Sequence, residues 1–410
     1  MSQAFCRFCA TPLTFVVVDL GMSPPSNAFV DPQGSDEAEK FYPLKVYLCG
    51  TCRLVQLPQY QTPGEIFSEY PYFSSYSTSW LDHVSRYARA ARERFELGAH
   101  SLVIELASND GHLLQCFRDA GIPVLGVEPA RNVAAVAVAA GIQTVTEFFG
   151  RSLARQLSSQ GQSADLVVAN NVIAHVPDLN DFVVGIREIL KPRGIATLEF
   201  PHVVRLINNV EYDTIYHEHF SYLSLSCASR IFDAHGLTVF DVDELPTHGG
   251  SLRIYAGKTQ DGFSKTPALE RVLAQERAAG FDRDDAYVNF DHSVRASKRA
   301  FLTFLIDAAA QGRRVAGYGA PAKATTQLNY CGVGRDLIDY TVDKNPYKQG
   351  RLIPGVHIPI YAPEKILETK PDYVVIFPWN IRDEVVKQMG AVRSWGGQFV
   401  VPIPVTEILA

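Results

Sequence analysis

The chain has 410 residues, which exceeds the usual size of one hydrophobic core and predicts two or three domains. Hydrophobic residues make up 47% and charged residues 20%, a composition that excludes disordered and fibrous proteins. The formal net charge of −6 gives no general attraction to nucleic acid or to an anionic membrane surface, so we expect neither as a partner.

The first ten residues contain no basic head followed by an apolar run. No later segment approaches the roughly 18 uninterrupted apolar residues of a membrane span. We therefore expect a cytoplasmic protein with no membrane partner.

Two Cys-x-x-Cys pairs stand in the N-terminal region, formed by Cys6 with Cys9 and by Cys49 with Cys52. Seven cysteines are too few for a disulfide scaffold of this length, and this spacing is typical of metal sites. Four thiolates from two such pairs suit one closed, tetrahedral, structural Zn²⁺ site. The alternatives are unrelated pairs or a redox motif, but neither pair opens a helix after a strand.

An aromatic, hydroxyl-rich segment at 69–80 follows the second cysteine pair and leads into a predicted helix at 81–95. Such a segment is by default a packed connector between domains. The alternative is that Tyr76 or its neighbours face a cleft, and we include Tyr76 among the candidate catalytic residues.

From residue 101 the sequence alternates strands and helices with short connections, which predicts a parallel sheet with helices on both faces. The expected strands span 101–107, 123–129, 143–149, 164–171 and 195–201, and the expected helices span 111–120, 132–140, 151–160 and 180–190. A helix at 226–235 and two strands at 237–245 and 251–257 would close this sheet with an antiparallel pair.

Small and polar residues end the first two strands of this sheet, where ligands of open α/β sheets bind. The first turn lacks the glycine pattern of a nicotinamide site, and its negative charge disfavours a pyrophosphate. An acidic turn followed by an acidic ribose partner favours S-adenosylmethionine, a cation without phosphate, and resembles the class I methyltransferases. A purely structural turn is the alternative. The candidate donor-binding residues are Glu105, Ala107, Asn109, Gly111, Glu128, Pro129, Phe148 beside the adenine, Asn170 and Asn171.

Proton-handling side chains crowd the segment 211–222, which is inserted between the fifth strand and the closing helix. Tyr216, Glu218, His219 and Tyr222 all lie within seven positions, and an imidazole titrates nearest neutral pH. His175 follows the fourth strand and is a second histidine that either faces the reaction centre or orients the next helix. We expect this insertion to perform acid–base chemistry.

The C-terminal part begins with a helical passage at 267–311 and continues as a further α/β unit, with strands at 313–319, 337–342 and 372–380. Cations and small residues gather at one predicted sheet edge, where they indicate a nucleotide diphosphate site. The alternative is a solvated basic loop. The candidate substrate-binding residues here are Gly319, Lys323, Asn345, Lys348 and Arg351.

Together these motifs resemble the zinc-containing sugar-nucleotide C-methyltransferases of deoxysugar and antibiotic-sugar biosynthesis, which methylate carbon 3 of a thymidine-diphosphate (TDP) 4-keto sugar. The resemblance spans essentially the full length and implies S-adenosylmethionine and structural Zn²⁺ as cofactors. By position, His219 and Tyr216 correspond to the proposed general bases, with Glu218 and His175 nearby. We also include Tyr222 among the candidate substrate-binding residues.

The family also implies the architecture. We expect a zinc-binding domain at 1–75, a donor-binding class I methyltransferase domain at 76–257, and a Rossmann-like sugar-nucleotide domain at 258–410. The protein should be a monomer or a weak oligomer. The competing interpretations are an O- or N-methyltransferase of another small metabolite, and a zinc-ribbon nucleic-acid or scaffold protein.

Overall fold

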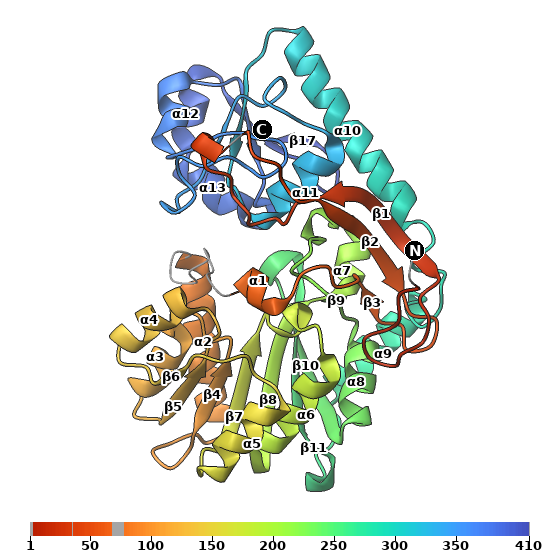
Figure 1. Ribbon diagram of the computed structural model, residues 1–410, viewed down its shortest axis with the longest axis vertical. Helices are drawn as coiled ribbons and strands as arrows, with labels where there is room; N and C mark the ends of the chain where they lie inside the picture. Colours follow the sequence, from red (N-terminus) through yellow and green to blue (C-terminus); the bar gives the residue numbers. More distant parts are fainter. Residues whose placement is uncertain (1–2, 35, 68–77, 410) are drawn as a thin grey trace.

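The structure is a computed structural model and describes residues 3–34, 36–67 and 78–409. The described residues form three sheets, with four, seven and six strands. The seven-stranded sheet fills the lower part of the view, the six-stranded sheet lies above it, and the hairpin of β1 and β2 lies beside their junction (Figure 1).

The seven-stranded sheet has the order β10-β11-β8-β7-β4-β5-β6. Its parallel strands are β4 (Val103–Leu106), β5 (Val124–Val127), β6 (Thr144–Val145), β7 (Ala164–Asn170) and β8 (Leu190–Pro201). Antiparallel β11 (Ser251–Lys258) lies between β8 and β10 (Leu237–Leu245). The predicted parallel sheet with a closing antiparallel pair is confirmed.

Helices cover both faces of this sheet because alternate strand residues are apolar on both sides. Leu166 and Val168 of β7 share a core with α2 (Thr78–Arg94) and α3 (His112–Arg118). Val167 and Ala169 point to the opposite core. That core contains residues of α5 (Arg151–Ser159), α6 (Leu179–Ile189) and α8 (Leu225–Ala234). Helix α4 (Arg131–Ala139) follows β5.

The predicted strand at 143–149 was too long, since only Thr144 and Val145 pair in the sheet. As an edge strand, β6 has one neighbour and soon leaves the sheet. Phe149 then packs on Phe182 with ring centroids 5.7 Å apart, whereas Phe148 is exposed. The hydrophobic residues after β6 therefore lie in a loop, where Phe149 is packed against a helix without pairing in the sheet.

The four-stranded antiparallel sheet consists of β1 (Phe15–Ser23), β2 (Tyr42–Leu48), β3 (Val55–Gln56) and β9 (Ser221–Tyr222). Strand β9 belongs to the insertion at 211–222. The last strand of this N-terminal sheet therefore comes from a segment about 170 residues further along the chain. The insertion also contains α7 (Val203–Asn208) and a short turn of helix, η4 (Tyr212–Thr214). Helix α1 (Pro63–Phe67) follows β3.

The predicted helical passage 267–311 is two helices, α9 (Pro267–Ala278) and α10 (Phe290–Ala310). The sheet that follows has the order β14-β13-β12-β15-β16-β17 and is parallel except for β17. Its strands are β12 (Val315–Tyr318), β13 (Thr341–Val342), β14 (Ile360–Tyr361), β15 (Tyr373–Ile376), β16 (Gln398–Val401) and β17 (Glu407–Leu409). Its helices are α11 (Ala322–Cys331), α12 (Glu364–Thr369) and α13 (Arg382–Gln388).

One apolar core joins the N-terminal strands, the insertion and α10. It includes Val17 of β1, Val46 of β2, Tyr212 and Ile215 of the insertion, and Phe290 of α10. Because these segments share one core, the insertion is held from both sides. Among the described residues, no helix has both the length and the apolar character needed to cross a membrane.

Candidate active site

The four predicted cysteine ligands converge. Their sulfur atoms all lie within 4.8 Å of one another, with Cys6 and Cys52 at 3.5 Å and Cys9 and Cys49 at 3.4 Å. Tetrahedral thiolates around Zn²⁺ with bonds of about 2.3 Å stand about 3.8 Å apart, so the cluster fits such an ion. The cluster contacts the core of the central sheet, which agrees with a structural role.

The predicted donor site lies where β4 and β5 end. The Glu128 carboxylate accepts hydrogen bonds from the backbone N–H groups of Asn109 and Ala130, both at 2.8 Å. Ala107, Asn109 and Gly111 have φ near +50°, +50° and +77°, so this turn is tightly coiled. A side chain at Gly111 would come within 3.0 Å of Ala137, so glycine is required for the helix that follows to pack.

Buried polar atoms without a hydrogen-bond partner in the described structure mark this edge of the sheet. They are Glu105 Oε2, Ser108 Oγ, both amide atoms of Asn170, and Asn171 Oδ1. Such atoms carry a desolvation cost that a polar ligand would remove. Most of these unpartnered atoms are hydrogen-bond acceptors, which suit a cationic ligand.

The electrostatics agree with a cationic donor. Burial, with added repulsion from Asp110 and Glu128, raises the pKa of Glu105 well above its usual range. Burial also raises the pKa of Glu128, against the two backbone hydrogen bonds it accepts. A sulfonium and an ammonium group brought here would relieve this repulsion, so the residues present fit S-adenosylmethionine.

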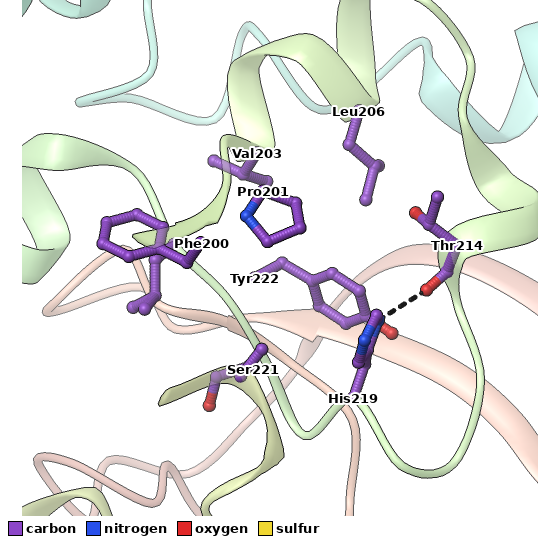
Figure 2. A pocket seen from close by; sticks show the side chains of 10 residues that line it. Phe200, Pro201, Val203, Leu206, Thr214, His219, Ser221 and Tyr222 are labelled. Carbon is purple, nitrogen blue, oxygen red and sulfur yellow. Dashed lines mark hydrogen bonds between the residues drawn. The ribbon is translucent and has the colours of Figure 1, made fainter. Parts of the chain in front are cut away.

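The structure brings His219 and Tyr216 together. His219 Nδ1 donates to the Thr214 carbonyl at 2.9 Å, which leaves Nε2 as the basic nitrogen (Figure 2). Tyr216 Oη lies 2.9 Å from this Nε2. The backbone therefore selects the tautomer. The arrangement gives a neutral imidazole whose Nε2 accepts a hydrogen bond from the tyrosine hydroxyl.

His175 packs against His219, with ring centroids 4.6 Å apart and a T-shaped geometry. Burial lowers the pKa of His175 to about 4. Burial and the neighbouring His175 ring hold the pKa of His219 well below its usual value. Both rings are thus neutral at neutral pH, as a general base must be before it acts.

Tyr222 is buried next to His219 and lines a cavity of about 20 Å³ with Phe200, Leu206 and Thr214 (Figure 2). A cavity of this size has room for about one water molecule. The structure therefore places Tyr222 beside His219 at this small cavity, and its contact with substrate stays a prediction.

The Glu218 side chain contacts the N-terminal region. Its carboxylate accepts a hydrogen bond from Asn27 Nδ2 at 2.6 Å, and the neighbouring His217 contacts the Pro43 carbonyl through Nε2 at 3.3 Å. Both contacts attach the insertion to the N-terminal module, and the role of Glu218 in orienting or polarising His219 or Tyr216 stays a prediction.

Lys323 lies between the insertion and the C-terminal sheet. Its ammonium donates to Asn380 Oδ1 at 3.0 Å and stands 4.1 Å from the Trp379 ring centroid. Trp379 Nε1 in turn donates to Asp213 at 2.7 Å. Burial lowers the pKa of Lys323, opposed by Asp213 and Glu211, while burial raises the pKa of Asp213 to about 6 and of Glu211 to about 7.

The other predicted substrate residues lie near the end of β12. Lys348 donates to the Ala320 carbonyl at 2.9 Å and stands 3.6 Å from Asp343. Gly319 has φ near +89°, and a side chain there would meet Pro378 at 2.6 Å. The Asn345 N–H donates to Asp343 at 2.8 Å, and Arg351 is exposed. Tyr76 lies outside the described residues.

The sequence analysis missed His248, which follows β10 in a His-Gly-Gly turn. His248 has φ near +54°, and its Nε2 accepts from Asn171 Nδ2 at 3.1 Å. Burial and the charge of Lys323 lower the pKa of His248 to about 4. This bond turns the Asn171 amide so that its oxygen is left for a ligand, and a histidine before two glycines was the available signal.

A buried ion cluster beneath this turn was also missed. Glu199 at the end of β8 contacts His83 at 2.8 Å, pairs with Arg253, and accepts from Thr247 Oγ1 at 2.8 Å. Burial opposes ionisation of Glu199, but His83 and Arg253 together lower its pKa to about 2. The cluster fixes the turn that carries His248.

These shifts predict the pH dependence of catalysis. Protonation of His219 would remove its basic lone pair, and because its pKa is lowered, kcat/KM should fall only at pH values clearly below 6.5. A pH profile of kcat/KM measures this, because it reports groups of the free enzyme. Burial raises the pKa of Glu211 to about 7, so Glu211→Gln is the control for an acid limb near that pH. An acid limb near pH 7 that persists in Glu211→Gln would contradict the prediction.

Comparison with known proteins identifies the family of each part of the chain. Residues 6–67 match a family described as "Putative zinc binding domain", residues 80–242 a "Methyltransferase domain", and residues 246–404 a "C-methyltransferase C-terminal domain". The chain is 34% identical over 408 residues to the C-methyltransferase NovU of Streptomyces niveus, covering 99% of this chain and 96% of NovU.

Two other matches cover less of the chain. A ubiquinone biosynthesis O-methyltransferase of Rhodopseudomonas palustris is 27% identical over 167 residues, covering 34% of this chain and 66% of that protein. The crystal structure of the PH0226 protein from Pyrococcus horikoshii shares 15% identity with a TM-score of 0.37, covering 48% of this chain and 99% of that one.

Proposed function

Because this chain belongs to the S-adenosylmethionine-dependent C-methyltransferase family that includes NovU, we propose that it methylates carbon 3 of a TDP-linked 4-keto deoxysugar. The observation that carries the proposal is the neutral His219–Tyr216 pair, held by the Thr214 carbonyl beside the donor edge of the sheet. Zn²⁺ on the four cysteines serves the fold.

The reaction begins with a proton on the carbon next to the ketone. His219 Nε2 accepts this proton, either directly once Tyr216 has moved aside or through the Tyr216 hydroxyl, which already points its proton at Nε2. The carbon's bonding electrons then delocalise onto the ketone oxygen as an enolate. S-adenosylmethionine, when bound, supplies the methyl group that forms the new carbon–carbon bond as its carbon–sulfur bond breaks.

Stabilisation of the enolate requires positive charge near the base. Lys323 acts electrostatically on His219 and lies on the C-terminal side of the insertion. We assign Lys323 to the stabilisation of the negative charge on the enolate. Gly319, Asn345, Lys348 and Arg351 are assigned to substrate binding near the end of β12. An ammonium group in a low-dielectric site stabilises developing negative charge strongly.

The test is incubation with labelled S-adenosylmethionine and a panel of TDP-linked keto sugars, followed by mass spectrometry and NMR of the product. We expect one new methyl carbon bonded to carbon 3. In D₂O with S-adenosylhomocysteine in place of the donor, the hydrogen on that carbon should exchange. Methylation of an oxygen or a nitrogen, with no exchange, would overturn the proposal in favour of an O- or N-methyltransferase.

A further inference from the structure

Arg7 stands between the two cysteines of the first pair, yet its side chain reaches the segments that carry both histidines of the candidate site. Its Nη1 donates to the Pro177 carbonyl at 2.9 Å, and its Nη2 donates to the Leu57 carbonyl. The guanidinium carbon stands 5.3 Å from the centroid of the Phe220 ring. One side chain thus contacts the segment after His175, the residue that follows strand β3, and the residue after His219.

The backbone closes the same circuit. Phe220 N–H donates to the Ala174 carbonyl at 2.8 Å, and Leu57 N–H donates to the Phe220 carbonyl at 3.0 Å. Ala174 precedes His175, and Phe220 follows His219. The two histidine rings that pack 4.6 Å apart are therefore joined by their own backbones, and Arg7 contacts three points of that junction.

Gln56 makes a second connection between the cysteines and this junction. Its side-chain Oε1 accepts from the Arg7 N–H at 2.9 Å, and its Nε2 lies 3.2 Å from Cys6 Sγ. Its backbone is paired with Ser221 in the strand that the insertion lends to the N-terminal sheet. A shift of the first cysteine pair would thus displace Ser221, which lies two residues after His219.

Charge explains why a guanidinium is placed here. Among the described residues no carboxylate forms an ion pair with Arg7, and the carbonyls and ring that it contacts are neutral. A divalent ion held by the four thiolates would leave two net negative charges at a site whose ligand Cys6 is next to Arg7 in the sequence. Such a centre would compensate a cation that has no carboxylate partner.

We propose that Arg7 is a positioning residue that ties the metal-binding cysteines to both histidine segments, holding His175 and His219 in their catalytic geometry. This inference rests on the proposed function for its kinetic consequence but not for its structural one. The metal site, in this view, acts on catalysis through Arg7 while contacting no substrate.

The test compares Arg7→Met and Arg7→Lys with Arg230→Met. Arg230 is an exposed arginine on α8 that donates to Thr51 in the second cysteine pair at 3.1 Å, so it contacts the same module away from the histidines. For Arg7→Met we expect kcat lower by about 100-fold, as a misplacement of about 1 Å produces. The donor Kd and the zinc content of Arg7→Met should stay at wild-type values. Arg7→Lys should have a kcat between those of Arg7→Met and the wild type. Arg230→Met should keep the wild-type kcat.

A wild-type kcat in Arg7→Met would overturn the proposal, and so would a parallel loss of zinc or of donor binding in both Arg7 variants. The imidazole ¹⁵N chemical shifts of His175 and His219 give a readout that needs no turnover. They should change in Arg7→Met and not in Arg230→Met, and unchanged shifts would also overturn the proposal. If the wild-type protein methylated no keto sugar, the proposed function would fail while these shifts still tested Arg7.

Discussion

Replacing His219 with Asn is expected to lower kcat by about 10²–10⁴-fold, the contribution of a general base. Asparagine can still donate to the Thr214 carbonyl, as Nδ1 does now, but it has no basic lone pair to receive a proton from carbon. The proposed donor site contains Glu105, Glu128 and Asn170 and does not include His219, so the donor Kd should stay near the wild-type value. Steady-state kinetics and calorimetry measure the two quantities.

His217→Asn is the matched control for this substitution. His217 lies on the same insertion and is also buried, but its ring packs on Tyr42 and Tyr60 and contacts the Pro43 carbonyl. Its substitution should leave kcat within a few-fold of wild type. Near-normal turnover in His219→Asn, or an equal loss in His217→Asn, would remove His219 from the role of base.

Tyr216→Phe divides the two routes for the proton. If the hydroxyl relays the proton to Nε2, the kcat of Tyr216→Phe should be as low as that of His219→Asn. The double variant should then have no lower kcat than either single variant. If His219 acts directly, Tyr216→Phe should lose much less. Deuterium exchange at carbon 3 measures the proton step apart from methyl transfer.

The strands of the donor sheet could be predicted because each carries a continuous apolar run bounded by turn residues. The cysteine cluster could be predicted because the chemistry of four thiolates depends on spacing more than on context. The end of β6 could not, since Phe149 packs on Phe182 from a loop that reads like a strand. A run of hydrophobic residues does not state which neighbour buries it.

The partners of the catalytic insertion could not be predicted for a different reason. The contacts from Asn27 to Glu218 and from Arg7 to Pro177 join residues more than 150 positions apart. His248 is placed by a left-handed turn, the amide of Asn171 and the Glu199 cluster beneath that turn. Composition identified which residues could move a proton, whereas their orientation depends on long-range packing.

Removal of the metal should unfold the N-terminal module and abolish turnover. Structural zinc supplies about 10–16 kcal/mol in isolated zinc-finger peptides, which is comparable to the whole stability of many domains. The four cysteines lie in the core that reaches the central sheet, and β3 pairs with β9 next to His219. Loss of the metal therefore disturbs both a core and the base.

The experiment is the double substitution Cys49→Ser with Cys52→Ser, compared with Cys116→Ser, a half-buried cysteine on α3 outside the cluster. We expect the double variant to lose bound zinc, to melt at a clearly lower Tm and to lack methyl transfer, whereas Cys116→Ser keeps all three. Chelator treatment of the wild-type protein should act faster at lower pH, because protons compete with the metal for thiolates. A double variant that kept its zinc and its Tm would show that these cysteines hold no structural ion.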